Sequence, residues 1–461
     1  MSNVWAKDDS ATGDAFREIA LVMPSSGGQN GTHRQISAMM ARRSGRISMR
    51  SQEQSATSIF DTNLQTGLVV VVLVVVFAAL VLAAAAQGQT FTTLHAFTGG
   101  ADGSTPYAGL SMDRAGNLYG TASYGGNKGG ACGGGCGTVF RMVPKGSSWV
   151  FYPLYAFSGA DGDTPQARVI IGPDGNLYGT TSYGGAYSKG VVFRLQPPAV
   201  VCKAFLCPWR ETVLYSFAGG SDGANPEFGD LTLDLAGNIY GTTPNGGSAA
   251  CTGGCGVVYE LSPSNGGWTE KILYSFQGGQ DGAYPYAGVV FDNAGNLYGT
   301  TFLGGAQYDG TVYDLTPSGS GWTESVLYSF GGGQDGFEVY SGVILDSAGN
   351  LYGASFSGAA AVYELSPSNG GWTFKALHDF GAYEGSVADL TFDSAGNLYG
   401  TLAQADQEVF RLTPSNGGWT LTGFSGGVGA FPLGNVVLDA SGNLYTTAAD
   451  YGGGFVFEVT P

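Results

Sequence analysis

The sequence predicts an all-β fold, a seven-bladed β-propeller closed by an N-terminal outer strand and preceded by one hydrophobic helix. The first observation is a motif of the form GNLYGT, which occurs seven times at intervals of 46 to 62 residues. A repeat of this length is typical of propellers and solenoids rather than of separate domains. The second observation is that each repeat resolves into four short strand signals with no helical period. The motif tyrosines are Tyr119, Tyr178, Tyr240, Tyr298, Tyr352, Tyr399 and Tyr445.

The fourth repeat shows the four strand signals clearly. They are Gly288–Asp292, Asn296–Thr301, Thr311–Pro317 and Trp322–Phe330. Each combines alternating apolar and polar residues with β-branched and aromatic side chains, and Gly, Asn or Pro stands between them. The sequence DNAGN after the first signal suits a tight hairpin, because Asp bonds the backbone ahead of it and Gly takes a positive φ. Four antiparallel strands repeated seven times match a seven-bladed propeller.

The repeats are offset at the two ends of the chain. The last copy of the third signal is Phe455–Pro461, and no fourth signal follows it. The first copy of the fourth signal stands alone at Thr90–Phe97, ahead of any other strand. We therefore expect the N-terminal strand to supply the missing outer strand of the last blade, so that no unpaired edge is left in the ring.

The segment before the repeats predicts export. Residues 1–66 are polar and are expected to be disordered, and residues 67–86 contain nineteen consecutive apolar residues, Leu68–Ala86. Five arginines between positions 34 and 50 place the N-terminal side in the cytoplasm. Ala84-Ala85-Ala86 has the form of a signal-peptidase site, but the apolar run also has the length of an uncleaved membrane anchor. Both alternatives stay open, and residues 87–461 form the exported propeller in either case.

Composition limits the partners. The chain has a net charge of −17 and only three His residues. An acidic surface repels phosphate backbones, so nucleic acid is not an expected partner. The repeats contain no phosphate-binding loop, nucleophile elbow or His-bearing metal motif, and we expect no cofactor and no metal.

The pattern LYSFxGGxDGxxPxAGLxxDxAGNLYGTTxxGG…GxVFxLxP, from about Thr90 to Pro461, resembles the GloVer tandem repeat of exported bacterial proteins with varied surface anchors. More distantly, DxxGNLY resembles NHL and sensor-type propellers. The resemblance implies an exported, extracellular, periplasmic or cell-surface protein whose molecular activity is unassigned. No C-terminal sorting signal follows Pro461, so we expect any anchor to be the N-terminal helix.

Acidic residues recur in the loops that follow six of the seven fourth strands, and Val428 stands at this place in the remaining loop. These acids would stand on one face as a broken ring, because loops after the fourth and second strands of a propeller open on the same side. The ring would bind Ca²⁺ or a cationic partner, or each acid would only form its own turn. We favour the turn. The acids are Asp102, Asp161, Asp222, Asp281, Asp335 and Glu384.

The six cysteines form three close pairs, which are Cys132 and Cys136, Cys202 and Cys207, and Cys251 and Cys255. An even number, local pairing and an exported chain favour disulfides over a zinc site.

Aromatic residues supply the remaining candidates. The YGG loops carry Tyr124, Tyr183 and Tyr451, which are expected on the same face as the acids and are the best candidates for ligand contact. A Trp recurs at one position of the repeat, and packing between blades is favoured over sugar stacking there. These are Trp149, Trp209, Trp268, Trp322, Trp372 and Trp419.

The function that these observations favour is a non-enzymatic binding scaffold for a protein or glycan at the cell surface, acting as a monomer. The alternative is a propeller enzyme of the lactonase or glycan lyase type, acting at the acidic channel mouth. An enzyme usually breaks the symmetry of its repeats with a unique cluster of polar residues, whereas the irregularities noted in this sequence are Gly-rich insertions and cysteine pairs.

Overall fold

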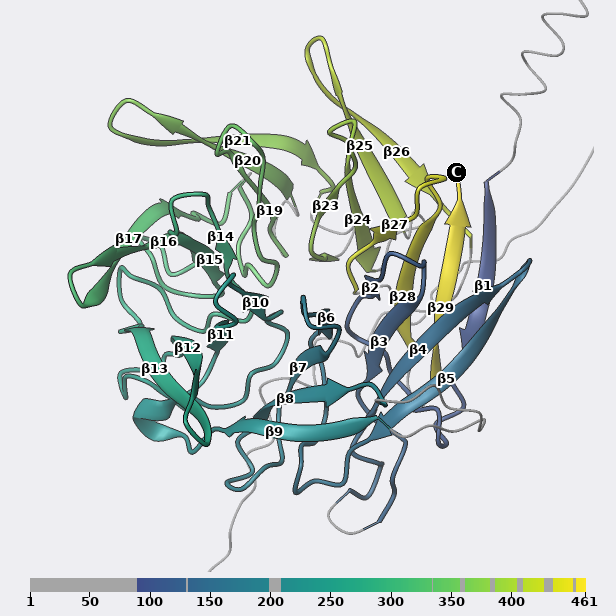
Figure 1. Ribbon diagram of the computed structural model, residues 1–461. Coiled ribbons are helices and arrows are strands. Elements are labelled where there is room, and N and C mark those ends of the chain that lie inside the picture. Colours follow the sequence, from purple (N-terminus) through teal and green to yellow (C-terminus); the bar gives the residue numbers. More distant parts are fainter. Residues whose placement is uncertain are drawn as a thin grey trace, which may run out of the picture. The chain divides into compact units, whose positions relative to one another are not determined.

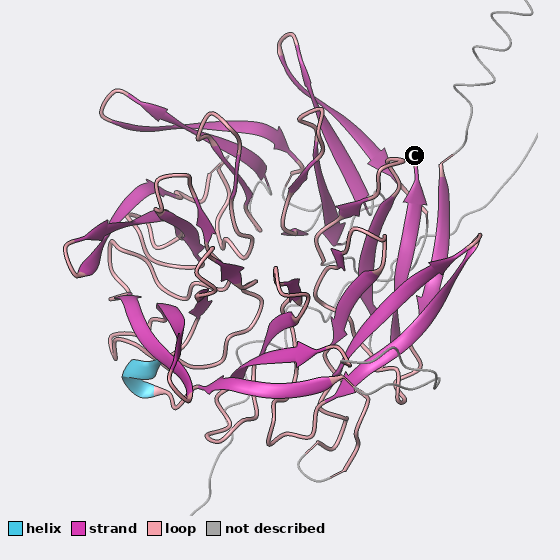
Figure 2. Cartoon of the chain, viewed as in Figure 1, coloured by secondary structure: helices cyan, strands magenta, loops and turns pink. Residues whose placement is uncertain are grey.

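A computed structural model describes residues 89–461, except for residues 130–131, 199–208, 334, 357–360, 382–385, 404–408, 427–433 and 451–452. Seven sheets surround a common centre (Figure 1). The described part of the chain is built from strands and loops (Figure 2), with one short 3-10 turn, η1 (Gly220–Asp222). The prediction of an all-β, seven-bladed propeller is confirmed.

Each blade begins with its innermost strand at the centre and ends with its outermost strand. Blade 1 contains β2 (Ser111–Met112), β3 (Leu118–Ala122), β4 (Thr138–Lys145) and β5 (Ser148–Ala156). Blade 2 contains β6 (Ile170–Ile171), β7 (Leu177–Thr181), β8 (Val191–Gln196) and β9 (Arg210–Ser216). Blade 3 contains β10 (Thr232–Leu233), β11 (Ile239–Thr243), β12 (Val257–Ser264) and β13 (Gly267–Ser275). Blade 4 contains β14 (Val290–Phe291), β15 (Leu297–Thr301), β16 (Thr311–Ser318) and β17 (Gly321–Ser329).

The remaining blades follow the same order with two variations. Blade 5 contains β18 (Ile344–Leu345), β19 (Leu351–Ala354), β20 (Ala361–Ser368) and β21 (Gly371–Asp379). Blade 6 contains β23 (Thr391–Phe392), β24 (Leu398–Ala403), β25 (Val409–Ser415) and β26 (Gly418–Phe424), and β22 (Ser386–Val387) also pairs with β24. Blade 7 contains β27 (Val437–Leu438), β28 (Leu444–Asp450), β29 (Gly453–Thr460) and, as its outer strand, β1 (Thr90–Ala96).

The two ends of the described chain meet in blade 7. Strand β1 pairs antiparallel with β29, from Thr90 opposite Thr460 to Ala96 opposite Phe455. The two strands lie side by side in Figure 1, although nearly the whole ring separates them in the sequence. Phe91 of β1 stacks on Phe457 of β29, with 5.9 Å between the ring centroids.

The Gly of the GNLYGT motif makes room for an aromatic ring. In blade 3, Gly241 of β11 stands opposite Tyr259 of β12, and a Cβ at position 241 would lie inside van der Waals contact with that ring. Gly120 has the same relation to Phe140 in blade 1. Because Gly alone lacks a Cβ, it lets a large, fully buried ring lie flat across the sheet. The rings at this position are Phe140, Phe193, Tyr259, Tyr313, Tyr363, Phe410 and Phe457. The first six stand opposite the motif Gly, whereas Phe457 stands opposite Thr446.

The Asp and Asn of the turn before each second strand hold that turn together. In blade 5, Asp346 Oδ1 accepts hydrogen bonds from the backbone N–H groups of Ala348 and Asn350. Its Oδ2 accepts hydrogen bonds from the Asn350 amide and the Tyr352 hydroxyl. Gly349 takes a φ of 85°. Burial acts to raise the pKa of Asp346, but these hydrogen bonds outweigh it and leave the pKa below its ordinary value.

Neighbouring blades share the hydrophobic core. One buried cluster joins Tyr178 and Val192 of blade 2 to Leu231 and Tyr259 of blade 3. The recurring Trp belongs to these interfaces. Trp209 of blade 2 packs edge-on against Tyr119 of blade 1, and the pairs Trp149–Tyr445, Trp372–Tyr298 and Trp419–Tyr352 repeat the contact. The packing interpretation of these Trp residues is confirmed.

The apolar run Leu68–Ala86 and the polar residues 1–66 lie outside the described residues. Among the residues that the structure does describe, no helix is long and apolar enough to span a bilayer.

Candidate ligand site at the channel mouth

The loops after the fourth and second strands come together, as predicted. In blade 1, Ser104 of the loop after β1 forms a β-bridge with Tyr124, which follows β3. Gly126 donates a backbone hydrogen bond to the Gly100 carbonyl. Blades 2, 3 and 4 repeat the bridge as Asp163–Tyr183, Ala224–Asn245 and Ala283–Leu303. These two loop sets therefore form one face of the ring, here called the loop face.

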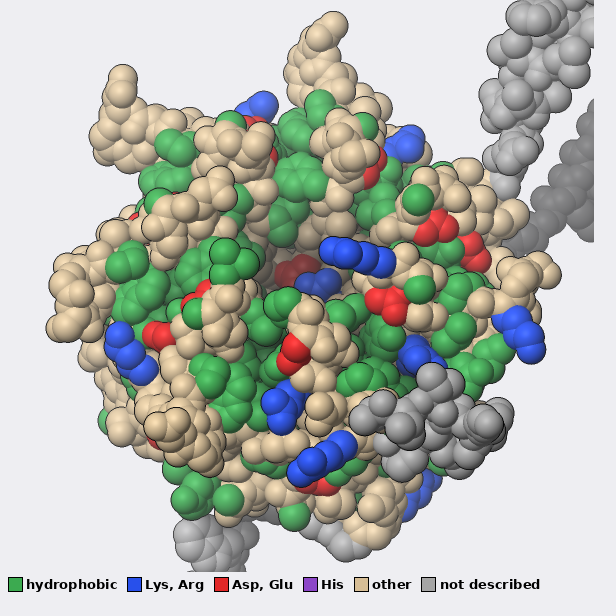
Figure 3. All heavy atoms as spheres, in the orientation of Figure 1, with side chains coloured by type: hydrophobic (Ala, Val, Ile, Leu, Met, Phe, Trp, Pro, Cys, Tyr) green, Lys and Arg blue, Asp and Glu red, His purple; other side chains and the backbone are tan. Residues whose placement is uncertain are grey.

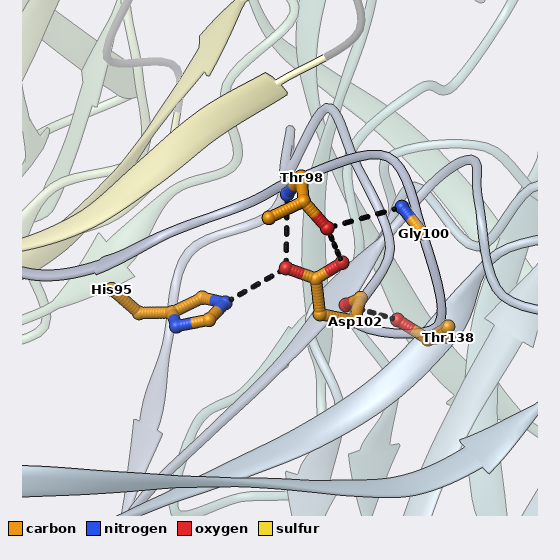
Figure 4. A network of polar contacts seen from close by, with 5 residues as sticks. All are labelled: His95, Thr98, Gly100, Asp102 and Thr138. Carbon is orange, nitrogen blue, oxygen red and sulfur yellow. Dashed lines mark hydrogen bonds and ion pairs between the residues drawn. The ribbon is translucent and has the colours of Figure 1, made fainter.

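The predicted acids point back into their own turns. Figure 4 shows Asp102 accepting hydrogen bonds from the backbone N–H and the hydroxyl of Thr98, at 2.9 Å and 2.6 Å, and contacting His95 Nε2 at 3.2 Å. Asp335 likewise accepts hydrogen bonds from the Gly331 and Gly333 N–H groups and from the Tyr328 hydroxyl.

Asp161, Asp222 and Asp281 make the same type of contact, each with a backbone N–H of its loop and with a Tyr hydroxyl. Each carboxylate satisfies local donors, which agrees with the turn interpretation of these five acids. Glu384 lies outside the described residues. Cation binding by this set stays a prediction.

His95 lies in contact with Asp102. Burial lowers the pKa of the imidazole, and the nearby carboxylate only partly offsets this effect. Burial acts to raise the pKa of Asp102, but hydrogen bonds, chiefly from Thr98, lower it further than burial raises it.

Two of the three predicted disulfides are present. Cys132–Cys136 and Cys251–Cys255 are bonded, with Cα–Cα distances of 5.2 Å and 5.0 Å. Cys202 and Cys207 lie outside the described residues. Cys132, Cys136 and Asp163 lie close enough to form a metal-ligand group, but a disulfide has no thiolate to offer a metal.

Two of the three candidate tyrosines, Tyr124 and Tyr183, lie on the loop face. Tyr124 and Tyr183 are 41% and 47% exposed, which is unusual for large aromatic side chains in this protein. Tyr451 lies outside the described residues. Tyr183 is electrostatically coupled to Glu227. Tyr183 therefore lies near Glu227 on the loop face.

Three charged residues, Arg168, Asp230 and Asp389, meet on the axis of the ring, and we call them the ionic cluster. Arg168 and Asp230 form an ion pair with Nη2–Oδ2 at 2.6 Å and Nε–Oδ2 at 2.8 Å. The carboxyl of Asp389 interacts electrostatically with both of them. Asp230 belongs to blade 3 and Asp389 to blade 6, which are not neighbours in the ring, so this coupling crosses the central channel. Figure 3 shows a hollow at the centre of the ring with acidic and basic side chains at its floor.

Glycines make room for this ionic cluster. In each blade, the residue two positions before the innermost strand faces the axis. In blade 4 this residue is Gly288, and a Cβ at this position would collide with the Asp230 carbonyl. In blade 5 it is Gly342, whose N–H donates to Asp389 at 2.7 Å. Burial and the charge of Asp230 raise the pKa of Asp389 to about 6. The residues at this position are Gly109, Arg168, Asp230, Gly288, Gly342, Asp389 and Asn435.

Sequence reasoning missed the ionic cluster, although a signal for it exists. Aligning the repeats on the first strand shows Gly in three blades and Arg, Asp, Asp and Asn in the other four. A position that faces the axis and departs from the repeat is where a unique polar group would be expected.

Aromatic rings from blades 3, 4 and 5 converge beside the ionic cluster. They lie in the loops that lead to the innermost strands or directly after the second strands. Tyr340 is central, with ring centroids 4.6 Å, 4.9 Å and 5.0 Å from Phe302, Phe356 and Tyr286, and Phe228 is 6.4 Å away. All five rings are half-buried. We call Phe228, Tyr286, Phe302, Tyr340 and Phe356 the mouth cluster.

The mouth cluster also breaks the symmetry of the repeat. The residue after the second strand is Phe302 in blade 4, with Phe356 at the matching position in blade 5, whereas Ser, Pro or Ala stands there in the other blades. Among the described residues, the hydroxyls of Tyr286 and Tyr340 have no hydrogen-bond partner and are not among the buried unsatisfied atoms. Their hydroxyls are therefore open to solvent and can meet a ligand.

Two acids accompany the mouth cluster. Glu227 precedes Phe228 and interacts electrostatically with Tyr183, Tyr286 and Tyr340, and Glu338 interacts with Tyr340. Burial raises the pKa of Glu227 to about 7. Within the described part of the chain no residue forms an ion pair or hydrogen bond with the Glu227 carboxylate. The mouth thus combines apolar ring surface, free hydroxyls and one unpaired acid, which suits a small polar ligand.

The chain matches the sequence model described as the Gloeobacter/Verrucomicrobia repeat over residues 79–253 and 234–459. It belongs to this repeat family. No curated protein matches it.

Solved structures resemble this chain at low identity and with TM-scores below 0.5. One is the extracellular domain of a protein described as a hybrid two-component system from B. thetaiotaomicron, with 12% identity and a TM-score of 0.48 over 80% of this chain and 39% of that one. Another is a gluconolactonase from Xanthomonas campestris, with 12% identity and a TM-score of 0.40 over 81% and 89% of the two chains. A third is a surface component of the type-IX secretion system of Porphyromonas gingivalis, with 13% identity and a TM-score of 0.40 over 67% and 42%. This chain spans well under two thirds of the first and third of these proteins.

Proposed function

We propose that this repeat protein is an exported, monomeric, non-enzymatic binding module whose ligand is a glycan held at the mouth of the central channel. The observation that carries the proposal is the mouth cluster, five half-buried rings from three consecutive blades that depart from the repeat. Aromatic rings provide apolar surface for a sugar, and the free hydroxyls of Tyr286 and Tyr340 can hydrogen-bond its hydroxyl groups.

Export is part of the same proposal. The two disulfides favour an oxidising compartment. The sequence Leu68–Ala86 would direct the chain across the membrane and, if it is not cleaved, tether the propeller to the cell surface. We further propose that the pairing of β1 with β29 is what keeps the ring closed, because it is the contact that joins the two ends of the propeller.

The test is a glycan array followed by titration calorimetry with the exported propeller. Replacing Tyr286 or Tyr340 by Ala should weaken binding of the strongest glycan by about fivefold or more, because each change removes a ring worth about 1 kcal/mol or more. Tyr308→Ala is the matched control, since Tyr308 is a 63% exposed Tyr that belongs to blade 4, as Tyr286 does, but lies outside the mouth cluster. Equal glycan affinities in all three variants would show that the glycan binds elsewhere. If the array shows no glycan binding and a protein ligand is found instead, the glycan proposal is wrong.

An enzyme of the lactonase or glycan lyase type is the second candidate, and the ionic cluster favours it. A carboxyl with a pKa of about 6, as in Asp389, can exchange a proton near neutral pH. The expected product of a lyase is an unsaturated sugar that absorbs in the ultraviolet. Turnover that Asp389→Asn abolishes without loss of folding would favour this candidate over a binding module.

A further inference from the structure

We propose that the mouth site recognises a cationic ammonium group, carried by its glycan ligand as an unacetylated amino sugar. This inference rests on the proposed function and adds the charge of the ligand to it. Three features of the mouth support the inference, and they are the orientation of the rings, the unpaired acid and the charge balance of the channel.

The rings pack against one another at different angles rather than as one flat platform. Tyr286 meets Phe302 at an interplanar angle of 83°, whereas Tyr286 meets Tyr340 at 38°. Ring faces that point in different directions suit a compact group better than a flat sugar. The face of an aromatic ring is electronegative, so the exposed parts of these faces attract an ammonium group.

Glu227 beside the mouth cluster lacks a cationic partner. The basic side chain of the ionic cluster is engaged, because Arg168 donates its backbone N–H, Nε and Nη2 to Asp230. No ion pair between described residues involves Glu227. A half-buried carboxylate without a partner is costly, and a bound cation would relieve that cost.

The charge of the channel is also negative. Arg168 is outnumbered by Asp230, Asp389 and Glu227 at this end of the channel. Walls of low polarity focus such a potential toward the mouth. A cationic ligand is therefore favoured over a neutral or anionic one of the same size.

The pH dependence of binding follows from Glu227. Its ionised form attracts the cation, and its pKa is about 7, so affinity should rise between pH 6 and pH 8. Tyr183, Tyr286 and Tyr340 face Glu227, and burial raises the pKa of each, so they stay neutral in this range. The pKa of Asp389 is about 6, and Glu338 is a further acid beside Tyr340, so a variant at position 227 is needed to assign the effect.

The experiment compares choline with its neutral isostere 3,3-dimethyl-1-butanol by titration calorimetry with the exported propeller. Choline carries a permanent charge, so its own titration does not contribute. We expect choline to bind about tenfold or more tightly than the isostere at pH 8, and about tenfold more tightly at pH 8 than at pH 6. A second pair of ligands, the glucosamine trimer and its N-acetylated form at pH 7, tests whether an unacetylated amino sugar carries the ammonium group.

Glu227→Gln should remove both the preference for choline and its pH dependence. The matched control is Glu270→Gln, which changes another half-buried Glu of raised pKa on an outer strand, away from the mouth, and should leave both unchanged. Should Glu227→Gln unfold the protein, Tyr340→Leu provides a second test, because loss of a ring face should weaken choline more than the isostere.

Each outcome decides a different statement. Equal binding of both isosteres, with glycan binding still lost in Tyr286→Ala, overturns the cation inference and leaves the proposed function intact. Preference for choline without preference for the glucosamine trimer overturns the amino-sugar source alone. Absence of binding by every probe and every glycan overturns the inference and the proposed function together.

Discussion

At the residue scale, the third strand of each blade carries one buried ring that is Phe in four blades and Tyr in three. The hydroxyls of Tyr259, Tyr313 and Tyr363 are buried and have no hydrogen-bond partner among the described residues. Burying a hydroxyl without a partner costs about 1–3 kcal/mol. The blades with Phe avoid this cost at the same place in the fold.

We expect Tyr259→Phe to stabilise the protein by about 1 kcal/mol, since it removes the unsatisfied hydroxyl and keeps the ring. Differential scanning calorimetry should show a higher Tm. Tyr240→Phe in the same blade is the control, because the Tyr240 hydroxyl donates to Asp234 and its loss should lower the Tm. A lower Tm in Tyr259→Phe would mean that this hydroxyl has a partner in solution.

At the element scale, three blade interfaces hold two carboxyls close together. Glu270 of β13 lies near Asp222, which belongs to the loop between β9 and β10. Burial and the charge of Asp222 raise the pKa of Glu270 to about 7. Glu211 with Asp161 and Glu324 with Asp281 repeat the arrangement, and each Glu has a pKa of about 7. Phe151, Phe374 and Leu421 stand at this position in other blades, so the pairs are not required by the fold.

These pairs make stability depend on pH. Each Glu binds its proton more tightly when folded, so its contribution is fully present below the unfolded pKa of 4.5 and is lost as pH rises through about 7. The triple change of Glu211, Glu270 and Glu324 to Gln should therefore leave the Tm nearly unchanged at pH 5 and raise it at pH 8. After allowance for solvent screening we expect about 1 kcal/mol for each site.

The reverse change provides the control for the carboxyl pairs. Phe374→Glu places a carboxyl at the equivalent position of blade 5, near Asp335, and should destabilise the protein more at pH 8 than at pH 5. The same shift in Tm at both pH values in the triple variant would contradict the assignment of the pH dependence to these pairs.

At the scale of the whole molecule, the proposal that the β1–β29 pairing keeps the ring closed predicts where the ring opens. Every other blade is a continuous segment of chain, whereas blade 7 combines β1 with β27, β28 and β29. Its outer strand is held by hydrogen bonds, the Phe91–Phe457 contact and the shared core rather than by a hairpin. Blade 7 is therefore the place where the ring should open first.

We expect a disulfide between β1 and β29 to raise the Tm. Thr92 and Glu458 are direct partners, and Cys at both positions would close almost the entire ring. Loop entropy alone gives about 6 kcal/mol as an upper bound for this bond, against about 3 kcal/mol for a bond across the β12–β13 hairpin.

Glu260 and Lys271 pair in that hairpin and provide the control disulfide. Equal effects of the two disulfides on the Tm would show that the ring does not open at blade 7.

The sequence determined the blade count, the strand signals, the packing role of the Trp residues and the pairing of Cys132 with Cys136 and Cys251 with Cys255. These features depend on neighbours in the chain or on a repeated environment, so periodicity and turn chemistry are enough to predict them. The turn role of Asp102 and its equivalents was also readable, because their donors lie within seven residues.

Only the tertiary structure decided what meets on the axis. Arg168, Asp230 and Asp389 come from three different blades, and each looks like an ordinary departure from the repeat when read alone. The mouth cluster is likewise assembled from separate loops of blades 3, 4 and 5. A local pattern fixes which residue each blade presents to the channel, but closure of the ring brings together residues that are far apart in the sequence, and the charge and shape of the site arise from that closure.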